Sequence, residues 1–104
     1  MSGSGPEAAV KRKVVAHLKK LDAYYFFPIA GPYARGGVPD IVACIRGKFV
    51  GIECKSARGK PTTLQRLELD SILQAGGVAL VINPQSMELG LGILTELAKR
   101  ERDQ

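Results

Sequence analysis

Three ionisable residues in the middle of the chain have types and spacing that suit phosphodiester chemistry. Asp40 ends a Gly-Val-Pro-Asp turn, and Glu53 and Lys55 lie two positions apart in an apolar segment. Side chains alternate along a strand, so Glu53 and Lys55 should share one face while Cys54 points to the other. A carboxylate and an ammonium group would then be presented together.

The segments that carry these residues predict a β-hairpin. Residues 40–45 and 48–55 are rich in β-branched side chains, and only a two-residue Arg-Gly turn separates them. Counting outward from that turn places Asp40 directly opposite Glu53. Opposed side chains have Cβ atoms about 5 Å apart, so the two carboxylates would repel each other unless a cation lies between them. The expected register therefore predicts a metal site.

Oxygen ligands with room for bound water favour Mg²⁺. Asp40, Glu53 and the backbone carbonyl of Cys54 are the candidate ligands. Lys55 would lie beside a bound water and stabilise negative charge as it attacks a phosphate. The alternative is that Asp40 ends a proline turn and that Glu53 and Lys55 are solvent-facing charges on an edge strand. The presence of all three residues together favours the catalytic interpretation.

The remaining segments predict an α/β (α+β) chain, with a small mixed sheet whose central hairpin is flanked by helices. We expect helices at 7–21, 62–75 and 85–100, a strand-like stretch at 24–29, a glycine-rich loop at 31–37 and a strand at 78–82. One domain should span residues 1–104. Residues 1–5 read equally as native or tag-derived sequence, and residues 101–104 should be frayed.

Two of these elements carry specific burial expectations. Residues 78–82 are wholly apolar, which is typical of a strand buried on both faces. In the helix at 62–75, Leu64, Leu67, Ser71 and Ala75 form one apolar stripe, and Leu69, Ile72 and Leu73 widen it.

Composition favours a polyanionic partner. Fifteen basic against ten acidic side chains give a formal charge of +5, and nucleic acid is the leading candidate. A chain of 104 residues has a modest core, so a two-fold dimer is plausible. Cys44 and Cys54 lie in apolar runs and should be reduced and buried. With no apolar leader or membrane span in the sequence, we expect a cytoplasmic setting.

The motifs resemble those of the PD-(D/E)xK nuclease superfamily. The matching residues are Gly37-Val38-Pro39-Asp40, Ile52-Glu53-Cys54-Lys55 and Gln65. The VRR-NUC branch is the most similar, because an early helix there carries a glutamate, which is Glu7 in this chain. The resemblance runs from about residue 7 to residue 77.

This resemblance implies a restriction-endonuclease-like core and a nuclease that uses Mg²⁺ or Mn²⁺ and leaves a 5′-phosphate. It implies catalytic roles for Glu7, Asp40, Glu53, Lys55 and Gln65. Short free-standing members resemble Holliday-junction resolvases and act as homodimers, so we expect a structure-selective endonuclease for branched DNA. Flap, restriction-type and RNA-processing nucleases remain alternatives, as does a non-catalytic DNA-binding module.

Glu7 and Gln65 also have structural interpretations. Ser4 with Glu7, and Thr62 with Gln65, both fit a capping box at a helix N-terminus. In the functional interpretation Glu7 approaches the metal directly or through water, and Gln65 positions Lys55 or the attacking water.

Basic residues are expected on loops around the site, where they would contact phosphates without reading sequence. They are Arg35, Arg46, Lys48, Arg58 and Lys60. Scattered solvation charge is an equal alternative for each. His17, the only histidine, receives no catalytic role, and Tyr33 in the glycine loop is a candidate for stacking on an unpaired base.

Overall fold

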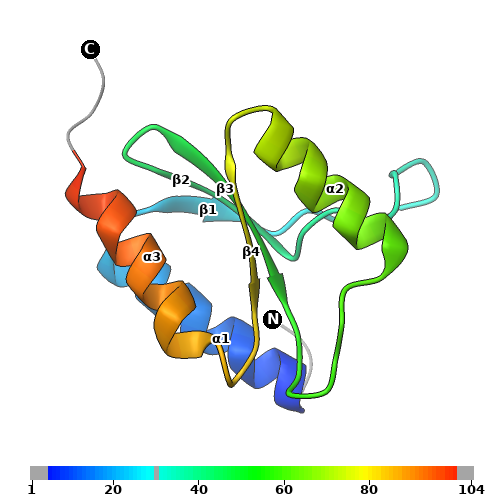
Figure 1. The fold of residues 1–104 in the computed structure, drawn as a ribbon, viewed down its shortest axis with the longest axis horizontal. Helices are drawn as coiled ribbons and strands as arrows, with labels where there is room; N and C mark the ends of the chain where they lie inside the picture. Colours follow the sequence, from blue (N-terminus) through cyan, green and yellow to red (C-terminus); the bar gives the residue numbers. More distant parts are fainter. Residues whose placement is uncertain (1–4, 30, 101–104) are drawn as a thin grey trace.

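The chain folds into a four-stranded sheet with helices on both faces (Figure 1). This computed structural model describes residues 5–29 and 31–100, so Ser4 and residues 101–104 lie outside the described part. The elements are α1 (Pro6–Lys20), β1 (Tyr24–Phe26), β2 (Ile41–Ile45), β3 (Lys48–Cys54), α2 (Thr63–Gln74), β4 (Val78–Ile82) and α3 (Met87–Lys99). The predicted α/β architecture is confirmed, although β1 ends before Pro28 and is shorter than expected.

The sheet order is β1-β2-β3-β4, with antiparallel pairing up to β3 and parallel pairing between β3 and β4. Helices α1 and α3 pack on one face, and α2 lies on the other face over β3 and β4. The predicted two-residue turn joins β2 to β3. Arg46 and Gly47 have φ values of 51° and 85°, the left-handed pair that a type I′ turn requires. This turn fixes the predicted register, in which Ile45 pairs with Lys48.

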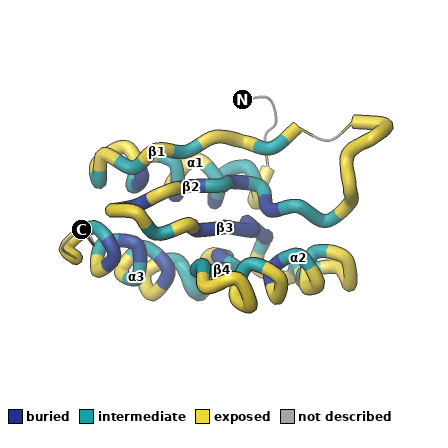
Figure 2. Tube along the Cα trace, turned by 90° about the horizontal axis from the view of Figure 1, so that it is seen from above, coloured by how far each residue is buried: buried dark blue, intermediate teal, exposed yellow. Residues whose placement is uncertain are grey.

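The core lies between the sheet and the α1–α3 layer. Val10, Val14 and Leu18 recur every fourth residue along α1 and pack against the inward side chains of β2 and β3. Burial in Figure 2 is deepest along these central strands. His17 Nε2 lies 2.8 Å from Thr95 Oγ1, a hydrogen bond that joins α1 to α3. The histidine therefore has a structural partner away from the acidic residues.

Two burial expectations are wrong. β4 is an edge strand, and of its five residues only Ile82 is buried, because no strand pairs with its outer side in the described part of the chain. Cys44 is exposed, because it points to the sheet face beside β1, which α2 leaves uncovered. Cys54 is buried as expected, and both cysteines are free thiols.

Helix α2 packs through the residues that widen the predicted stripe. Leu64 and Leu67 are each 57 % exposed, whereas Leu69 is the buried residue of the helix. Within residues 5–29 and 31–100, no helix has the length and apolar character needed to cross a membrane.

Candidate active site

Asp40 lies where the β2–β3 hairpin ends. The last strand pair is Ile41 with Ile52, so the same register places Asp40 opposite Glu53. Pro39 has no N–H to continue the ladder. Instead, the backbone N–H of Cys54 donates a 2.8 Å hydrogen bond to Asp40 Oδ2. This bond holds the Asp40 carboxylate against the β3 segment that carries Glu53.

Glu53 and Lys55 are buried neighbours. Their side-chain atoms Oε2 and Nζ are 3.2 Å apart, and the residues are only 1 % and 9 % exposed. The backbone N–H of Lys55 donates a 2.9 Å hydrogen bond to the carbonyl of Ile82, which extends the pairing of β3 with β4. The alternative that they are solvent-facing charges on an edge strand is therefore wrong, since β3 is central and both are buried.

The electrostatics of this cluster favour a bound cation. Burial, together with the charge of Asp40, raises the pKa of Glu53 to about 7, although Lys55 opposes this shift. Glu53 Oε1 is buried and has no hydrogen-bond partner in the described part of the chain. A buried oxygen without a partner is costly. Burial also raises the pKa of the Cys54 thiol to about 12, so that thiol stays protonated.

Glu7 is not brought into a cluster with the two acids. It is exposed in the first turn of α1, and residues 5–29 and 31–100 contain no group of three His, Cys, Asp or Glu side chains placed to hold a metal ion. The cap residue of α1 is Gly5, and no side-chain capping bond forms there. The expected Ser4 cap falls outside the described residues, and contact of Glu7 with a metal through water stays a prediction.

Gln65 forms the predicted capping box at the start of α2. Its Oε1 accepts a 2.8 Å hydrogen bond from the N–H of Thr62, and its own N–H donates to Thr62 Oγ1 at 3.2 Å. The side-chain carbonyl is therefore engaged by the backbone, which leaves the amide nitrogen as the group available for another partner.

Gly37 connects the α2 cap to the loop that holds Asp40. Its φ is +82°, and a Cβ there would lie 2.5 Å from the carbonyl carbon of Leu64 and 2.8 Å from the nitrogen of Gln65. Only glycine fits this approach. Sequence reasoning included Gly37 in the Gly-x-Pro-Asp motif but missed its contact with α2.

Comparison with known proteins decides the family. The profile described as archaeal Holliday junction resolvase (Hjc) matches residues 9–101. The chain belongs to the Hjc family. It is also 31% identical over 83 residues to "Putative nuclease p44" from Acyrthosiphon pisum secondary endosymbiont phage 1, a match that covers 78% of this chain and 86% of that protein.

The fold agrees with this assignment. The solved structure of Archaeoglobus fulgidus Hjc, a Holliday junction resolvase from an archaeal hyperthermophile, aligns with a TM-score of 0.55 and 18% identity. The alignment covers 75% of this chain and 69% of that one. The sheet and helices therefore form the restriction-endonuclease-like core that was expected. As an Hjc-family member, the chain is a metal-dependent DNA endonuclease, as the sequence predicted.

The basic residues predicted around this Hjc-family site divide into two groups. Arg58 and Lys60 lie in the exposed loop after Lys55, and between them a Cβ on Gly59 would lie 3.4 Å from Lys55 Cβ. Arg46 and Lys48 lie at the hairpin turn, at the opposite end of the paired strands from Asp40, and Arg46 Nε donates a 3.1 Å hydrogen bond to the carbonyl of Arg100. The expectation that Arg46 and Lys48 are near the site is wrong. The whole length of β2 and β3 separates the turn from Asp40 and Glu53.

Arg35 lies on the loop that precedes Gly37. Its Nε is 3.3 Å from Glu68 Oε2, so the guanidinium is already paired with α2, although it is largely exposed. Tyr33, in the same loop, is fully exposed.

Proposed function

We propose that this chain is a Mg²⁺-dependent, homodimeric endonuclease that cuts Holliday junctions, with Asp40, Glu53 and Lys55 at its reacting centre. One observation carries the proposal. A buried Glu53 faces Asp40 across the hairpin, has one oxygen without a partner and has the Lys55 ammonium 3.2 Å from the other oxygen. A purely structural role explains neither the burial of Glu53 opposite a second acid nor its oxygen without a partner.

The residues present fit the metal that the family implies. Asp40 and Glu53 would hold it together with the backbone carbonyl of Cys54, an oxygen set that Mg²⁺ prefers and Mn²⁺ accepts. When bound, the ion supplies Lewis-acid polarisation of the phosphate and a more acidic water. Binding would also offset the repulsion between the two carboxylates, which in its absence contributes to the raised pKa of Glu53.

Each residue has a separate task in the proposed reaction. Asp40 is oriented by the Cys54 N–H, so its carboxylate is positioned before any ligand arrives. Lys55 opposes the rise in the pKa of Glu53 and directs positive charge toward the attacking water and the phosphate. Gln65 is a positioning residue, since it caps α2 where the loop before Asp40 packs. Glu7 would act only through water.

The finer branch assignment is also part of the proposal. The Gly-x-Pro-Asp turn, the Glu-x-Lys triplet and a glutamate on the first helix support the VRR-NUC branch. Arg58 and Lys60, beside the reacting centre, are the proposed phosphate contacts.

A cleavage assay on defined DNA structures tests this function. A four-way junction, a flap, a plain duplex and single strands are incubated with the protein in Mg²⁺, in Mn²⁺ and in chelator. We expect junction cutting that leaves 5′-phosphates, stops in chelator and returns when the ion is added. Asp40→Asn keeps an acceptor for the Cys54 N–H but removes the charge, so it should stay folded and lose cutting. Cutting that resists chelator, or binding without cutting in either ion, would contradict the proposal.

A further inference from the structure

Three aromatic side chains lie exposed on one side of the sheet, and we call Tyr24, Phe26 and Phe49 the aromatic face. Tyr24 pairs with Cys44, and Cys44 pairs with Phe49, so these side chains point to the same side. Phe26 follows by alternation along β1. Tyr24 is 71 % exposed, and the two phenylalanines are each 47 % exposed. In Figure 2, α2 lies beside β4 and away from β1, so it leaves this part of the sheet open.

The aromatic face and the acids lie on the same side of the sheet. Side chains alternate along a strand, so Asp40 shares a side with Val42 and Cys44. Phe26 pairs with Val42, two residues after Asp40, and Tyr24 pairs with Cys44, four residues after it. At about 3.4 Å per residue, the two rings lie about 7 Å and about 14 Å along the sheet from Asp40. A DNA strand held at the acids therefore reaches both rings within a few nucleotides.

The two rings on β1 are too far apart for neighbouring bases of an intact duplex. The ring centroids of Tyr24 and Phe26 lie 6.3 Å apart, and the ring planes are tilted by 58°. Successive bases in one strand of a duplex follow each other at about 3.4 Å. Two neighbouring bases that each cover one ring have therefore left the stack. The spacing favours unpaired nucleotides over paired ones.

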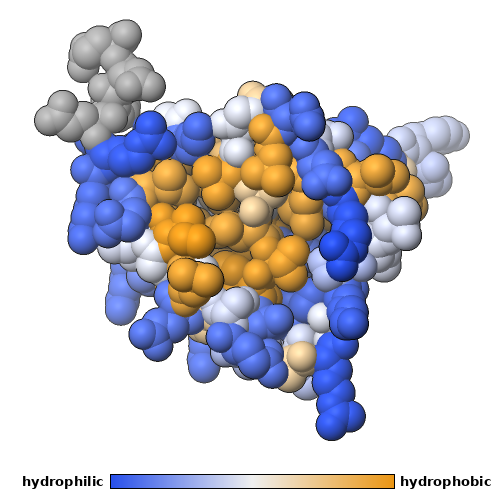
Figure 3. All heavy atoms as spheres, in the orientation of Figure 1, coloured by the Kyte–Doolittle hydropathy of each residue, from blue (hydrophilic) through white to orange (hydrophobic). Residues whose placement is uncertain are grey.

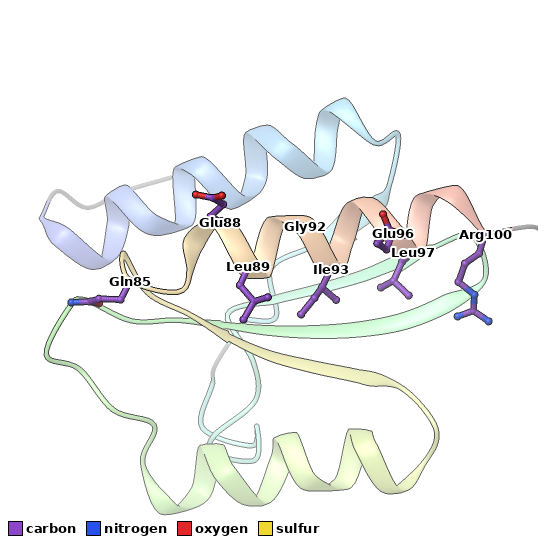
Figure 4. Close-up of a pocket in the computed structure, with 8 residues that line it drawn as sticks. All are labelled: Gln85, Glu88, Leu89, Gly92, Ile93, Glu96, Leu97 and Arg100. Atoms are coloured by element: carbon purple, nitrogen blue, oxygen red, sulfur yellow. The ribbon is translucent and has the colours of Figure 1, made fainter.

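The residue types also favour bases as the bound groups. Aromatic side chains in several classes of nucleic-acid-binding protein hold unpaired bases by stacking on them. A second exposed apolar surface is aliphatic. Figure 3 shows it between α3 and α2, and in Figure 4 Leu89, Ile93 and Leu97 point to the same side along a groove on α3. These aliphatic side chains offer no ring on which a base can stack, so the two surfaces suit different partners.

A positive charge lies at the border of the aromatic face. Phe49 and Arg35 line one groove of about 290 Å³, together with Glu68 on α2. Arg35 Nε lies 3.3 Å from Glu68 Oε2, which holds the guanidinium beside the groove, and the arginine side chain is 78 % exposed. The other N–H groups of a guanidinium can donate to a DNA phosphate. Rings for bases with a cation for the backbone are typical of sites that bind single strands.

We propose that the aromatic face binds unpaired nucleotides next to the phosphate that is cut. The strand held at the acids runs toward β1, so that bases beside the cut stack on Phe26 and Tyr24 and a further base packs against Phe49. This inference rests on the proposed function and deepens it, because it names the part of branched DNA that is recognised. Bases at a branch point have fewer stacked neighbours than bases in a plain duplex, so less energy is needed to unstack them.

Binding of short single strands tests the stacking directly. Fluorescence anisotropy in Ca²⁺ compares a labelled oligodeoxythymidine with an abasic oligomer of the same length, which keeps the phosphates but has no bases. Wild type should bind the thymidine strand at least about 10-fold more tightly. Tyr24→Ala and Phe26→Ala should each weaken binding of that strand by roughly 5-fold or more and leave binding of the abasic strand unchanged.

Two kinds of control show whether the rings themselves are needed. Tyr24→Phe and Phe26→Tyr each keep a ring, so both should bind the thymidine strand within about 2-fold of wild type. Leu89→Ala is the matched control, because it removes an exposed apolar side chain from α3, on the opposite side of the sheet. It should leave the affinity for both oligomers unchanged. Circular dichroism checks that every variant is folded.

Cutting of a modified junction tests where the unpaired bases lie. Four-way junctions with one abasic nucleotide, on the 5′ or the 3′ side of each cut, are compared with the intact junction in single-turnover reactions. On one of the two sides, the abasic nucleotide should lower the wild-type rate by roughly 5-fold, as Phe26→Ala should on the intact junction. The two changes together should cost no more than either alone, because both remove the same stacking contact.

Some outcomes would overturn the base site and leave the nuclease intact. These are equal affinity of wild type for the thymidine and abasic strands, or loss of affinity for both strands in the alanine variants. Sedimentation that shows Tyr24→Ala or Phe26→Ala dissociating an oligomer, with strand binding unchanged, would assign the face to a protein contact instead. The reverse result, a base preference with the expected variant pattern but no cutting in Mg²⁺ or Mn²⁺, would reject the proposed function and keep the base site.

Discussion

Lys55 Nζ lies 3.2 Å from Glu53 Oε2, and both residues are almost completely removed from solvent. The pair is one ammonium beside two acids, because Asp40 faces Glu53 from the next strand. The cluster without a bound ion therefore gains an excess of negative charge when Glu53 ionises, in a place that solvent hardly reaches. This arrangement favours the binding of a cation.

Replacing Lys55 should abolish cutting but spare DNA binding. Lys55→Ala leaves Glu53 without its nearest positive charge and leaves the attacking water without a neighbouring ammonium group. We expect the single-turnover rate on a junction to fall by at least about 100-fold. Junction affinity, measured by gel shift in Ca²⁺, should change only a few fold, because the exposed basic loops remain. A variant that binds normally and retains most of its rate would remove Lys55 from the reacting centre.

The stability of the metal-free protein should depend on the ionisation of Glu53. In the folded protein the Glu53 carboxyl group has a pKa of about 7, compared with an ordinary value of 4.5. Between these values the folded state binds more protons than the unfolded state, so the free energy of unfolding falls as the pH rises. The loss should be on the order of 3 kcal/mol and complete by about pH 8.

Urea unfolding in chelator across this pH range measures the effect. Glu53→Gln should not show this fall in the free energy of unfolding. Subtracting its values from those of wild type cancels the contributions of the other titrating groups. Mg²⁺ added at high pH should restore stability to wild type only. If wild type and Glu53→Gln show the same pH dependence, Glu53 is not the group responsible.

Gly37→Ala should harm both folding and cutting. The substitution places a side chain at positive φ and drives its Cβ into the backbone of α2. We expect a loss of about 2 kcal/mol or more in urea unfolding, together with reduced cutting because the loop before Asp40 must move. Gly47→Ala is the control. It has a similar positive φ of 85° but open space around the new Cβ, so it should cost less and leave cutting intact. Equal effects of the two changes would mean that the contact with α2 is unimportant.

The two groups of basic residues should differ in their effect on DNA binding. Arg58→Ala and Lys60→Ala, beside the acids, should each weaken junction binding and lower the slope of log affinity against log salt by about 1. Arg46→Ala and Lys48→Ala, at the far end of the hairpin, should change neither quantity. Fluorescence anisotropy at several salt concentrations measures both, and equal slopes for all four variants would contradict this division.

The hairpin and its acids were predictable because local rules decide them. A two-residue Arg-Gly turn permits one register, and strand alternation then determines which side chains share a face. The burial of Glu53 and Lys55 was not predictable in the same way. It arises because β3 lies second from the edge with β4 beside it, and strand order is not encoded in any short segment.

The wrong predictions share a physical cause. The residues of a strand or helix indicate its type, but they do not show which other elements pack against it. The apolar run of β4 suggested burial on both faces, yet the strand lies at the edge. Within the predicted stripe of α2, Leu64 and Leu67 are exposed and Leu69 is buried, because spacing alone does not tell which part of a wide stripe meets the sheet. Cys44 is exposed for a similar reason, since one helix cannot cover a whole sheet face.

The hydrogen bond from Lys55 N–H to Ile82 O makes Lys55 part of the same ladder as the edge strand. An interaction that restrains β4 therefore also restrains the backbone at Lys55. A change that loosens β4 would therefore displace the backbone that carries Lys55, although Ile82 and Lys55 lie far apart in the sequence.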